Sequence, residues 1–339
     1  LILNDSDLYS YCINTKTGDL QWRFSILKSF HQEDGYRILT DQIAGGGYYQ
    51  SKATAAEGKV FIGTPSRFVY AMDAETGKEI WKFEMGAAIS AAPVFDNNKI
   101  YIGQQGGEDE FYCLDAKTGK MIWKQNVGWV WGSAAVSDGM VFIPAVDGYI
   151  YGLNANNGNI IWRFRADKSV CSEPLIMGEN VYFGSWDTFL YKFDMKTGKL
   201  IWKYNAGSDS GVAIGFDGKL ILPGAGFSCI DAETAKVLWK PETGHTNNTP
   251  AYHSGQVFVS WAGRLVALDA NTGKINWSFN GPGGVTAPVV GNNGYVYSGS
   301  GSNQYFYALN EKGNGDGTTD CLFRIKIAGG LLEATPALY

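Results

Sequence analysis

The chain has 339 residues, of which 45% are hydrophobic and 18% are charged, and its formal net charge is −5. This acidic balance argues against a nucleic-acid partner, because phosphates require a concentrated basic surface. The sequence has no stretch of about 18 apolar residues, so it predicts no membrane span.

The chain opens on LILND, which is typical of the inside of a β-strand. No signal peptide is visible within the sequence. We therefore expect this sequence to be trimmed from a longer protein, so the missing signal does not indicate a compartment.

A pattern that ends in tryptophan begins soon after the LILND segment and recurs along the chain. Its first copy is YCINTKTGDLQW, and clearer copies such as YAMDAETGKEIW and YCLDAKTGKMIW follow. Successive copies are about 40 residues apart, a period typical of propeller blades with four short strands. The copies end at Trp22, Trp81, Trp123, Trp162, Trp202, Trp239 and Trp277, and a degenerate eighth copy ends at Phe323.

The longest interval between copies lies between Trp22 and Trp81 and holds about twenty extra residues. We predict that this insertion, about residues 24–50, lies on the face where the fourth strand of one blade connects to the first strand of the next. We call this the loop face. Long loops in compact folds are usually functional or disordered. The insertion supplies the candidate binding residues His31, Arg37, Tyr48 and Tyr49.

The unit from Ile89 to Gln125 shows the predicted strands of one blade. The segments SAAPVF, KIYIG, FYCLDA and KMIWKQ are typical of strands, and DNN, QQGGEDE and KTG separate them. Asn and Gly tolerate positive φ, and Asp bonds its own turn backbone, so these connections favour hairpins. No segment shows a convincing 3.6-residue period, so the sequence predicts no substantial helix.

The two ends of the chain complement each other. The segment ATPALY at Ala334–Tyr339 matches the first strand of a unit, and LILND matches the second. A single blade cannot bury both of its faces, but radially stacked blades cover one another. We therefore predict one domain over residues 1–339, an all-β, eight-bladed propeller of four-stranded antiparallel blades. Pairing of the C-terminal strand with the N-terminal strand would close it.

The pattern A-x-D-x-x-T-G-x-x-x-W resembles the repeat of pyrroloquinoline-quinone (PQQ) dehydrogenases. The same repeat occurs in cofactor-free relatives, notably the lipoprotein of the outer-membrane β-barrel assembly machinery. The resemblance implies eight blades locked by the recurring tryptophan and an extracytoplasmic location. This chain departs from the repeat at Ala235, at Asn156–Gly158 and in the missing tryptophan of the last copy. It also lacks the adjacent cysteine pair and inserted calcium ligands that PQQ binding would need, so we expect no cofactor.

The recurring aspartates are predicted to hold hairpin turns rather than to form a ring of acidic groups, because Asp bonds its own turn backbone. They are Asp73, Asp115, Asp194, Asp231 and Asp269.

The five cysteines form no C-x-x-C motif. Cys12, Cys113 and Cys229 share the small-residue position of the third strand, where free cysteine behaves as a small buried hydrophobe. We therefore predict no structural disulfide.

No catalytic or metal-binding motif emerges from the remaining polar residues. Asn314, Asp316 and Asp320 resemble a calcium loop only in part, and a lengthened hairpin explains them better. The three histidines His31, His245 and His253 lack metal-ligand spacing. We therefore predict no metal site.

Four tryptophans are not explained by the repeat: Trp129, Trp131, Trp186 and Trp261. They fall in second-to-third or fourth-to-first connections, which emerge on the loop face. Three interpretations stay open, namely loop packing at the channel mouth, a stacking platform for a sugar or other flat ligand, or a protein-contact patch. Polar residues predicted to contribute to this surface are Arg67, Asp187, His245, Arg264 and Glu333.

The leading functional hypothesis is a non-catalytic, monomeric scaffold that binds a protein or a glycan through the loop face. One alternative is a polysaccharide lyase or hydrolase that uses a Tyr, His or Arg of the insertion; this rests on fold analogy, and function is decided by the site. A second alternative is an extracytoplasmic sensor domain of a larger membrane protein.

Overall fold

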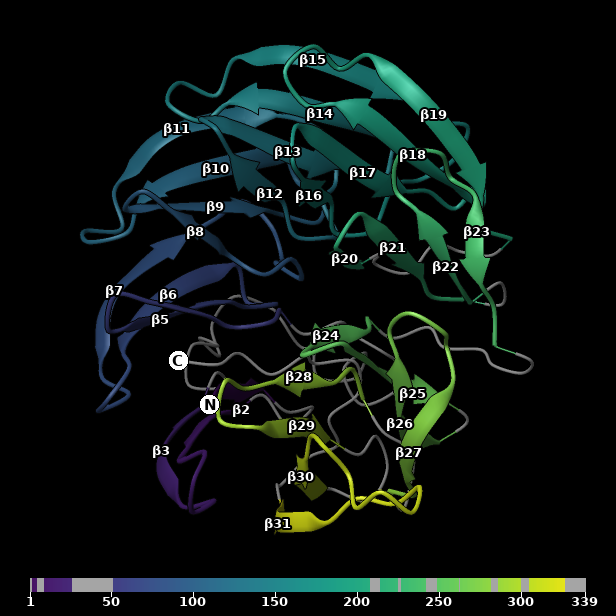
Figure 1. The fold of residues 1–339 in the computed structure, drawn as a ribbon. Coiled ribbons are helices and arrows are strands. Elements are labelled where there is room, and N and C mark those ends of the chain that lie inside the picture. Colours follow the sequence, from purple (N-terminus) through teal and green to yellow (C-terminus); the bar gives the residue numbers. More distant parts are fainter. Residues whose placement is uncertain are drawn as a thin grey trace.

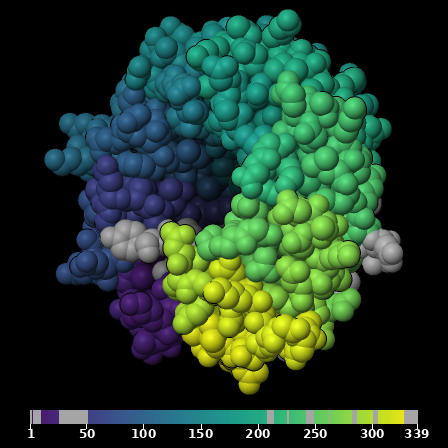
Figure 2. Space-filling model, in the orientation of Figure 1, coloured from purple at the N-terminus to yellow at the C-terminus, as the bar shows by residue number. Residues whose placement is uncertain are grey.

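The structure is a computed structural model that describes residues 2–4, 9–25, 51–207, 214–224, 227–241, 249–261, 263–281, 286–299 and 305–326. These residues form antiparallel sheets arranged as a ring (Figure 1). Figure 2 shows that the surface is hollowed at the centre of this ring. Within the described ranges, no helix is long and apolar enough to cross a membrane.

Seven sheets have four strands each, and one further sheet has three, β1 (Ile2–Asn4), β2 (Tyr9–Ile13) and β3 (Leu20–Ser25). The strands of the seven blades are β4 (Thr54–Ala56), β5 (Lys59–Gly63), β6 (Phe68–Asp73), β7 (Glu79–Glu84); β8 (Val94–Asp96), β9 (Lys99–Gly103), β10 (Glu110–Asp115), β11 (Met121–Asn126); β12 (Ala135–Ser137), β13 (Met140–Pro144), β14 (Tyr149–Asn154), β15 (Ile160–Arg165); β16 (Leu175–Met177), β17 (Asn180–Gly184), β18 (Phe189–Asp194), β19 (Leu200–Asn205); β20 (Ile214–Phe216), β21 (Lys219–Leu222), β22 (Ser228–Asp231), β23 (Val237–Trp239); β24 (Ala251–His253), β25 (Gln256–Trp261), β26 (Arg264–Asp269), β27 (Ile275–Phe279); and β28 (Val289–Val290), β29 (Tyr295–Gly299), β30 (Tyr305–Asn310), β31 (Cys321–Lys326).

The predicted all-β propeller of four-stranded antiparallel blades is confirmed, but the count of eight such blades is wrong. The described residues form seven of them. In the remaining sheet, β1 pairs with β2 through Ile2 and Cys12, just as the second strand of the β4–β7 blade pairs with the third through Phe61 and Ala71. This sheet therefore starts at the second-strand position and has no described inner strand. The segment predicted to fill that place, Thr335–Tyr339, lies outside the described residues.

The three-stranded sheet lies between the last and the first four-stranded blades. On one side Tyr11 and Ile13 pack with Tyr297 and Phe306, and the Tyr297 hydroxyl donates to Thr15 O at 3.2 Å. Its other side packs on the β4–β7 blade through the cluster Ile2, Cys12, Trp22, Ala53, Val60, Ile62, Tyr70, Met72 and Ala74. The ring of sheets is therefore closed by side-chain packing.

The first strands of consecutive blades lie beside one another around the centre. Contacts join β4 to β8, β8 to β12, β12 to β16, β16 to β20, β20 to β24 and β24 to β28. These short strands are partly exposed, whereas the second and third strands are mostly buried between blades. The first strands therefore line the central hollow of Figure 2.

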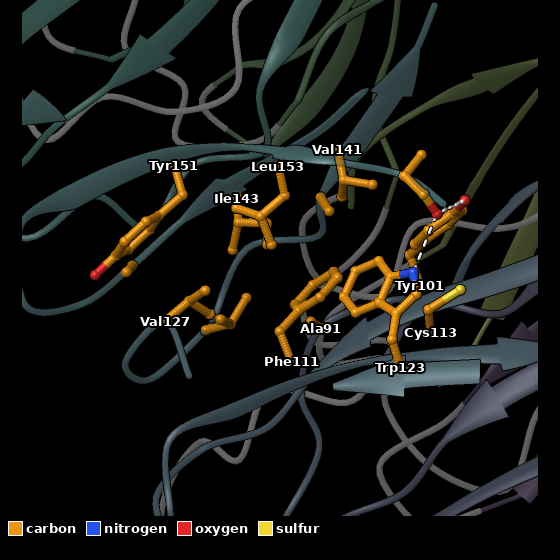
Figure 3. Close-up of a cluster of buried hydrophobic side chains, with 14 residues drawn as sticks. Ala91, Tyr101, Phe111, Cys113, Trp123, Val127, Val141, Ile143, Tyr151 and Leu153 are labelled. Atoms are coloured by element: carbon orange, nitrogen blue, oxygen red, sulfur yellow. Dashed lines mark hydrogen bonds between the residues drawn. The ribbon is translucent and has the colours of Figure 1, made fainter. Parts of the chain in front are cut away.

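The tryptophan that ends each repeat bonds to the next blade. Trp123 donates its indole N–H to Ala155 O at 3.1 Å and packs among Tyr101, Phe111 and Val141 (Figure 3). The same indole-to-carbonyl bond joins Trp22 to Ala74, Trp81 to Ala116, Trp162 to Met195, Trp239 to Ala270 and Trp277 to Glu311. Each bond satisfies a buried N–H group, so the aromatic ring can fill the space between blades at little polar cost.

The turn glycine of each repeat lies directly against the tryptophan ring of the preceding repeat. Gly119 has a φ of +71°, and a Cβ built there would lie 2.7 Å from the Trp81 ring. The same close approach pairs Gly77 with Trp22, Gly158 with Trp123, Gly198 with Trp162, Gly273 with Trp239 and Gly313 with Trp277. In the last repeat, Phe323 replaces tryptophan and lies against Gly18 of the three-stranded sheet. The repeated sequence therefore encodes one contact between blades.

The interface between the β16–β19 and β20–β23 blades departs from this pattern. Lys192 stands opposite Trp202 in the β18–β19 pair, a position that is Ala, Gly or Cys in the other sheets. The Lys192 side chain is 1% exposed, and its ammonium group donates to Ala232 O (3.1 Å), the carbonyl that the indole contacts elsewhere, and to Glu233 Oε2 (2.6 Å). Trp202 instead donates to Glu233 O at 3.1 Å and is only half-buried. At this interface Ala235 replaces the turn glycine, with a φ of 57°, and packs on the same hydrophobic cluster as Trp202.

We expect Gly119→Ala to lower the free energy of unfolding by about 2 kcal/mol, because it adds a side chain at positive φ and against Trp81. The matched change Ala235→Gly removes a methyl group at the equivalent turn position, and we expect it to cost less than about 1 kcal/mol. Urea unfolding of both variants measures the difference. Equal losses would show that the turn residue is not constrained by the aromatic ring.

The turn aspartates hold hairpins, as their spacing predicts. Asp115 Oδ1 accepts the Thr118 backbone N–H and the Thr118 hydroxyl, each at 2.7 Å. The same bonds join Asp73 to Thr76, Asp194 to Thr197, Asp231 to Thr234 and Asp269 to Thr272. In each turn the threonine hydroxyl, followed by backbone N–H groups, lowers the pKa of the aspartate carboxyl.

These lowered pKa values predict acid sensitivity. A carboxyl with a lower pKa in the folded state stabilises that state above its unfolded pKa, which is about 3.9 for Asp, and the stabilisation is lost as pH falls through the folded pKa. We therefore expect the urea concentration at the unfolding midpoint to decrease when the pH is lowered below about 4. Asp115→Asn should weaken this dependence, because Asn154 accepts the corresponding backbone bonds without a charge. An unchanged acid profile in that variant would contradict the assignment.

All five cysteines lie within the described residues and are free thiols. Cys12, Cys113 and Cys229 are buried opposite the tryptophan of their own sheet. Burial raises the pKa of Cys113 to about 12 and that of Cys229 to about 11, so neither carries a reactive thiolate near neutral pH.

Candidate functional site

The loop face is built from the connections between second and third strands and between consecutive blades. Every four-stranded blade has its strands in chain order and antiparallel, so these two kinds of connection share one end of the sheets. The hairpin turns with the repeat aspartates occupy the opposite end. Trp129 and Trp131 lie between β11 and β12, Trp186 lies between β17 and β18, and Trp261 ends β25. Strand order therefore assigns all four to the loop face.

Three of these tryptophans come from neighbouring loops, and we call them the tryptophan cluster (Trp129, Trp131 and Trp186). The rings of Trp131 and Trp186 meet edge to face with centroids 5.8 Å apart. Trp129 lies over the β9–β10 loop, where a Cβ built on Gly106 would be 3.8 Å from its ring. Trp129 is 47% exposed and Trp186 is 40% exposed. Trp129 and Trp186 therefore both present aromatic surface to solvent on the loop face.

Trp261 belongs to a different part of the loop face. It is partly buried, and its ring centroid is 6.3 Å from that of Phe227, within the core shared by the β20–β23 and β24–β27 blades. Trp261 therefore packs as a loop residue of its own blades.

Two of the polar residues predicted for this face, Arg67 and Asp187, have separate partners. Arg67 pairs with Glu84 at 3.1 Å, and Arg264 is exposed opposite Trp261 in the β25–β26 pair. Asp187 accepts the Tyr191 hydroxyl (2.6 Å) and the backbone N–H groups of Asp167 and Phe189, so it organises its own loop. The remaining predicted residues lie outside the described ranges: His31, Arg37, Tyr48, Tyr49, His245 and Glu333.

A polar cluster at the entrance to the first strands was missed by sequence reasoning. Lys52 Nζ donates to Glu173 Oε1 at 2.7 Å, and Ser133 Oγ donates to the same oxygen at 3.1 Å. The Ala92 backbone N–H in turn donates to Ser133 Oγ at 3.0 Å. Burial opposes ionisation of Glu173, but Lys52 and Ser133 outweigh it and lower the pKa of the Glu173 carboxyl. An ionised bridge therefore ties four consecutive blades beside the central hollow.

The signal for this cluster was present in the sequence. Each of its residues stands two positions before the first strand of a blade, where other blades have Thr249 or Ala287. A lysine and a glutamate at equivalent positions near the ring axis are complementary. Because Glu173 immediately follows Cys171 and Ser172, which pack on Gly132, this bridge lies next to the tryptophan cluster.

A second arrangement, on the opposite face, resembles a catalytic triad in composition only. His253 Nδ1 lies 2.7 Å from Glu311 Oε1 and 3.1 Å from Ser254 Oγ. A triad needs the acid on one ring nitrogen and the nucleophile on the other. Here both partners meet Nδ1, so the histidine cannot relay a proton between them, and its contact with buried Glu311 is structural.

The segment with partial calcium-loop spacing is a hairpin. The Asn314 amide donates to Asp320 Oδ1 at 3.0 Å, and Asp316 Oδ1 accepts the Thr318 hydroxyl at 2.6 Å. These oxygens are engaged within the loop itself. Over the described residues, no group of three or more His, Cys, Asp or Glu side chains could hold a metal ion.

The ring of blades, the indole-to-carbonyl bond and the contact of the turn glycine with the tryptophan ring together define a PQQ-like repeat propeller. The chain matches the family described as "Outer membrane protein assembly factor BamB" over residues 5–110, 107–222 and 223–316, and it belongs to that family.

The chain is similar to curated proteins of different function. It is 24% identical to a tetrathionate hydrolase of Acidithiobacillus ferrooxidans over 83% of this chain and 56% of that protein. It is 26% identical to the outer membrane protein assembly factor BamB of Shewanella oneidensis over 50% of this chain and 46% of that protein. The chain thus spans about half the length of these curated relatives.

The fold is also similar to a solved structure, BamB from Moraxella catarrhalis. The TM-score is 0.71 at 19% identity, and the match covers 83% of this chain and 89% of the other. At this identity the likeness concerns the fold.

Proposed function

We propose that this chain is a non-catalytic, monomeric and extracytoplasmic scaffold that binds a protein partner in outer-membrane protein assembly through its loop face. The observation that carries the proposal is the exposed tryptophan cluster. Aromatic side chains exposed together are unfavourable in water and are frequent in protein interfaces. Family membership supports the partner class, since relatives carry the name of an outer membrane protein assembly factor.

The hydrogen-bonded groups of the described site favour binding over catalysis. The serine–histidine–glutamate contact at His253 has the wrong geometry for nucleophile activation, and the buried thiols Cys113 and Cys229 have raised pKa values. Glu173, a carboxylate beside the central hollow, is neutralised by Lys52. Such a paired carboxylate is suited to holding loops in place.

We further propose that residues 1–339 act as one propeller unit and that the C-terminal segment, residues 334–339, supplies the inner strand of the β1–β3 sheet. The sequence match of ATPALY to first strands supports this. The packing of Phe323 against Gly18 already brings the last blade beside that sheet.

Complementation tests the proposed function. The chain would be exported to the periplasm of a Shewanella oneidensis strain that lacks its own assembly factor BamB, and folded outer-membrane proteins would be measured by their heat-modifiable migration on gels. We expect partial recovery with this chain and none with an empty vector. Accumulation of the folded chain without any recovery would contradict the proposal.

The similarity to tetrathionate hydrolase supports a second candidate, because that match covers most of this chain. Incubation of the purified chain with tetrathionate, followed by chemical determination of residual tetrathionate, separates the two. We expect no loss of tetrathionate above a heat-denatured control. Turnover proportional to protein concentration would favour the hydrolase.

A further inference from the structure

We propose that the tryptophan cluster and the carboxylates around it form a docking surface for an arginine-bearing, positively charged polypeptide segment. This inference rests on the proposed function and names the chemistry of the partner. The surface belongs to three consecutive blades, β8–β11, β12–β15 and β16–β19, which are adjacent in Figure 1.

Carboxylates occupy the loops that touch the cluster. Asp147 lies against Gly128, immediately before Trp129, and the Val146 backbone N–H donates to Trp129 O at 2.8 Å. Asp187 follows Trp186 directly and accepts the backbone N–H of Asp167. Both tryptophan-bearing loops are therefore bordered by negative charge.

The β9–β10 loop adds negative charge on the other side of Trp129. It contributes Glu108 and Asp109, and the Val127 backbone N–H donates to Asp109 O at 3.0 Å. Asp109 Oδ1 is a buried oxygen with no hydrogen-bond donor among the described residues. This oxygen is closed off from solvent, so the loop contributes its negative charge rather than a direct contact.

The balance of charge favours a cationic partner. The loops that touch the cluster hold six carboxylates, Glu108, Asp109, Asp147, Asp167, Glu173 and Asp187, against one cation, Lys168, and Arg165 ends the neighbouring strand β15. The Arg165 guanidinium already lies over the Tyr149 ring at 5.4 Å. The Lys52–Glu173 pair beneath adds no net charge.

Arginine matches this surface better than other side chains. Its planar guanidinium stacks on indole rings and donates to carboxylates in the same contact, whereas an ammonium group is more strongly hydrated. A neutral glycan could stack on the tryptophans and donate hydroxyl hydrogen bonds to the carboxylates, but it would not neutralise their charge. The arrangement therefore favours a basic polypeptide over a sugar.

Fluorescence anisotropy tests the inference with three labelled peptides, (Gly-Arg-Ser)₄, (Gly-Lys-Ser)₄ and (Gly-Glu-Ser)₄. We expect the arginine peptide to bind most tightly, the lysine peptide more weakly and the glutamate peptide least. Because the contact is charged and exposed, the affinity for the arginine peptide should fall as NaCl is raised from 20 to 300 mM, about a fourfold change in Debye length.

Two variants and a matched control assign the binding. The double variant Trp129→Ala with Trp186→Ala should weaken binding of the arginine peptide about tenfold. The double variant Asp147→Asn with Asp167→Asn should weaken binding of the same peptide several-fold and reduce the salt dependence of the affinity. Glu57→Gln with Glu75→Gln removes the same charge from the opposite face and should leave the affinity within about twofold. Thermal unfolding checks that all variants fold.

Three results would overturn the inference: equal affinity for the arginine and glutamate peptides, equal weakening by the opposite-face control, or no effect of either loop-face variant. Binding of maltohexaose at this surface, in place of the arginine peptide, would also overturn it. If complementation succeeds while the peptide test fails, the scaffold function stands and only the partner chemistry is wrong. If both fail, the proposed function falls as well.

Discussion

Replacing Trp123 by alanine is expected to lower the free energy of unfolding by about 3–5 kcal/mol, the usual range for a large buried aromatic side chain. The change removes the ring that fills the space between the β8–β11 and β12–β15 blades and also the bond to Ala155 O. The resulting cavity would have rigid walls, because both blades are fixed by their own strand pairing. Equilibrium unfolding in urea, followed by far-ultraviolet circular dichroism, measures the loss.

Trp202→Ala is the internal control for this prediction. Trp202 is half-buried because Lys192 occupies the space opposite it, so less apolar contact is lost. We expect the loss to be less than half of that for Trp123→Ala. Similar losses for the two variants, or a loss below about 1 kcal/mol for Trp123→Ala, would mean that the rings do not lock the blades.

Glu233→Ala is expected to lower the free energy of unfolding by about 2–3 kcal/mol, although the Glu233 side chain is 80% exposed. The cause is its partner, since the buried Lys192 ammonium would keep only Ala232 O and the nearby rings of Tyr182 and Trp202. The matched control is Glu75→Ala, at the equivalent turn position of the β4–β7 blade, where the residue opposite tryptophan is Ala71. That change should remain within about 0.5 kcal/mol.

A double-mutant cycle tests the cause of this loss. Lys192→Ala restores the small residue found in the other blades, so the pair Lys192→Ala with Glu233→Ala should be more stable than Glu233→Ala alone. The coupling measured by the cycle isolates the interaction of the two side chains. Additive losses would show that Glu233 acts through the turn backbone and not through Lys192.

The blades were predictable because their determinants are local. A hairpin turn such as Asp115–Gly119 is specified by adjacent residues, and alternating burial along a strand is visible in the sequence itself. Repetition strengthened these local signals, and the tryptophan position followed from them. The completeness of the eighth sheet was not local, because its inner strand would have to come from the other end of the chain.

The site was predicted less well because its contacts join distant loops. The pairing of Trp131 with Trp186 depends on how two neighbouring blades bring their connections together, and sequence could assign only the shared face. Lys52 and Glu173 are separated by 121 positions and meet only because both precede first strands near the axis. Lys192 was overlooked because a charged residue in a position otherwise reserved for small ones contradicts the repeat.

The direction of the tryptophan contact has a consequence for synthesis of the chain. Each indole binds a turn of the blade that follows it, from Trp22 on Ala74 to Trp277 on Glu311. During synthesis, the most recently made repeat tryptophan therefore has no partner until the blade that follows it has been made. Only when Phe323 reaches Gly18 is the last such ring covered. Truncated products would keep one uncovered ring, the kind of exposed apolar surface that chaperones and proteases recognise.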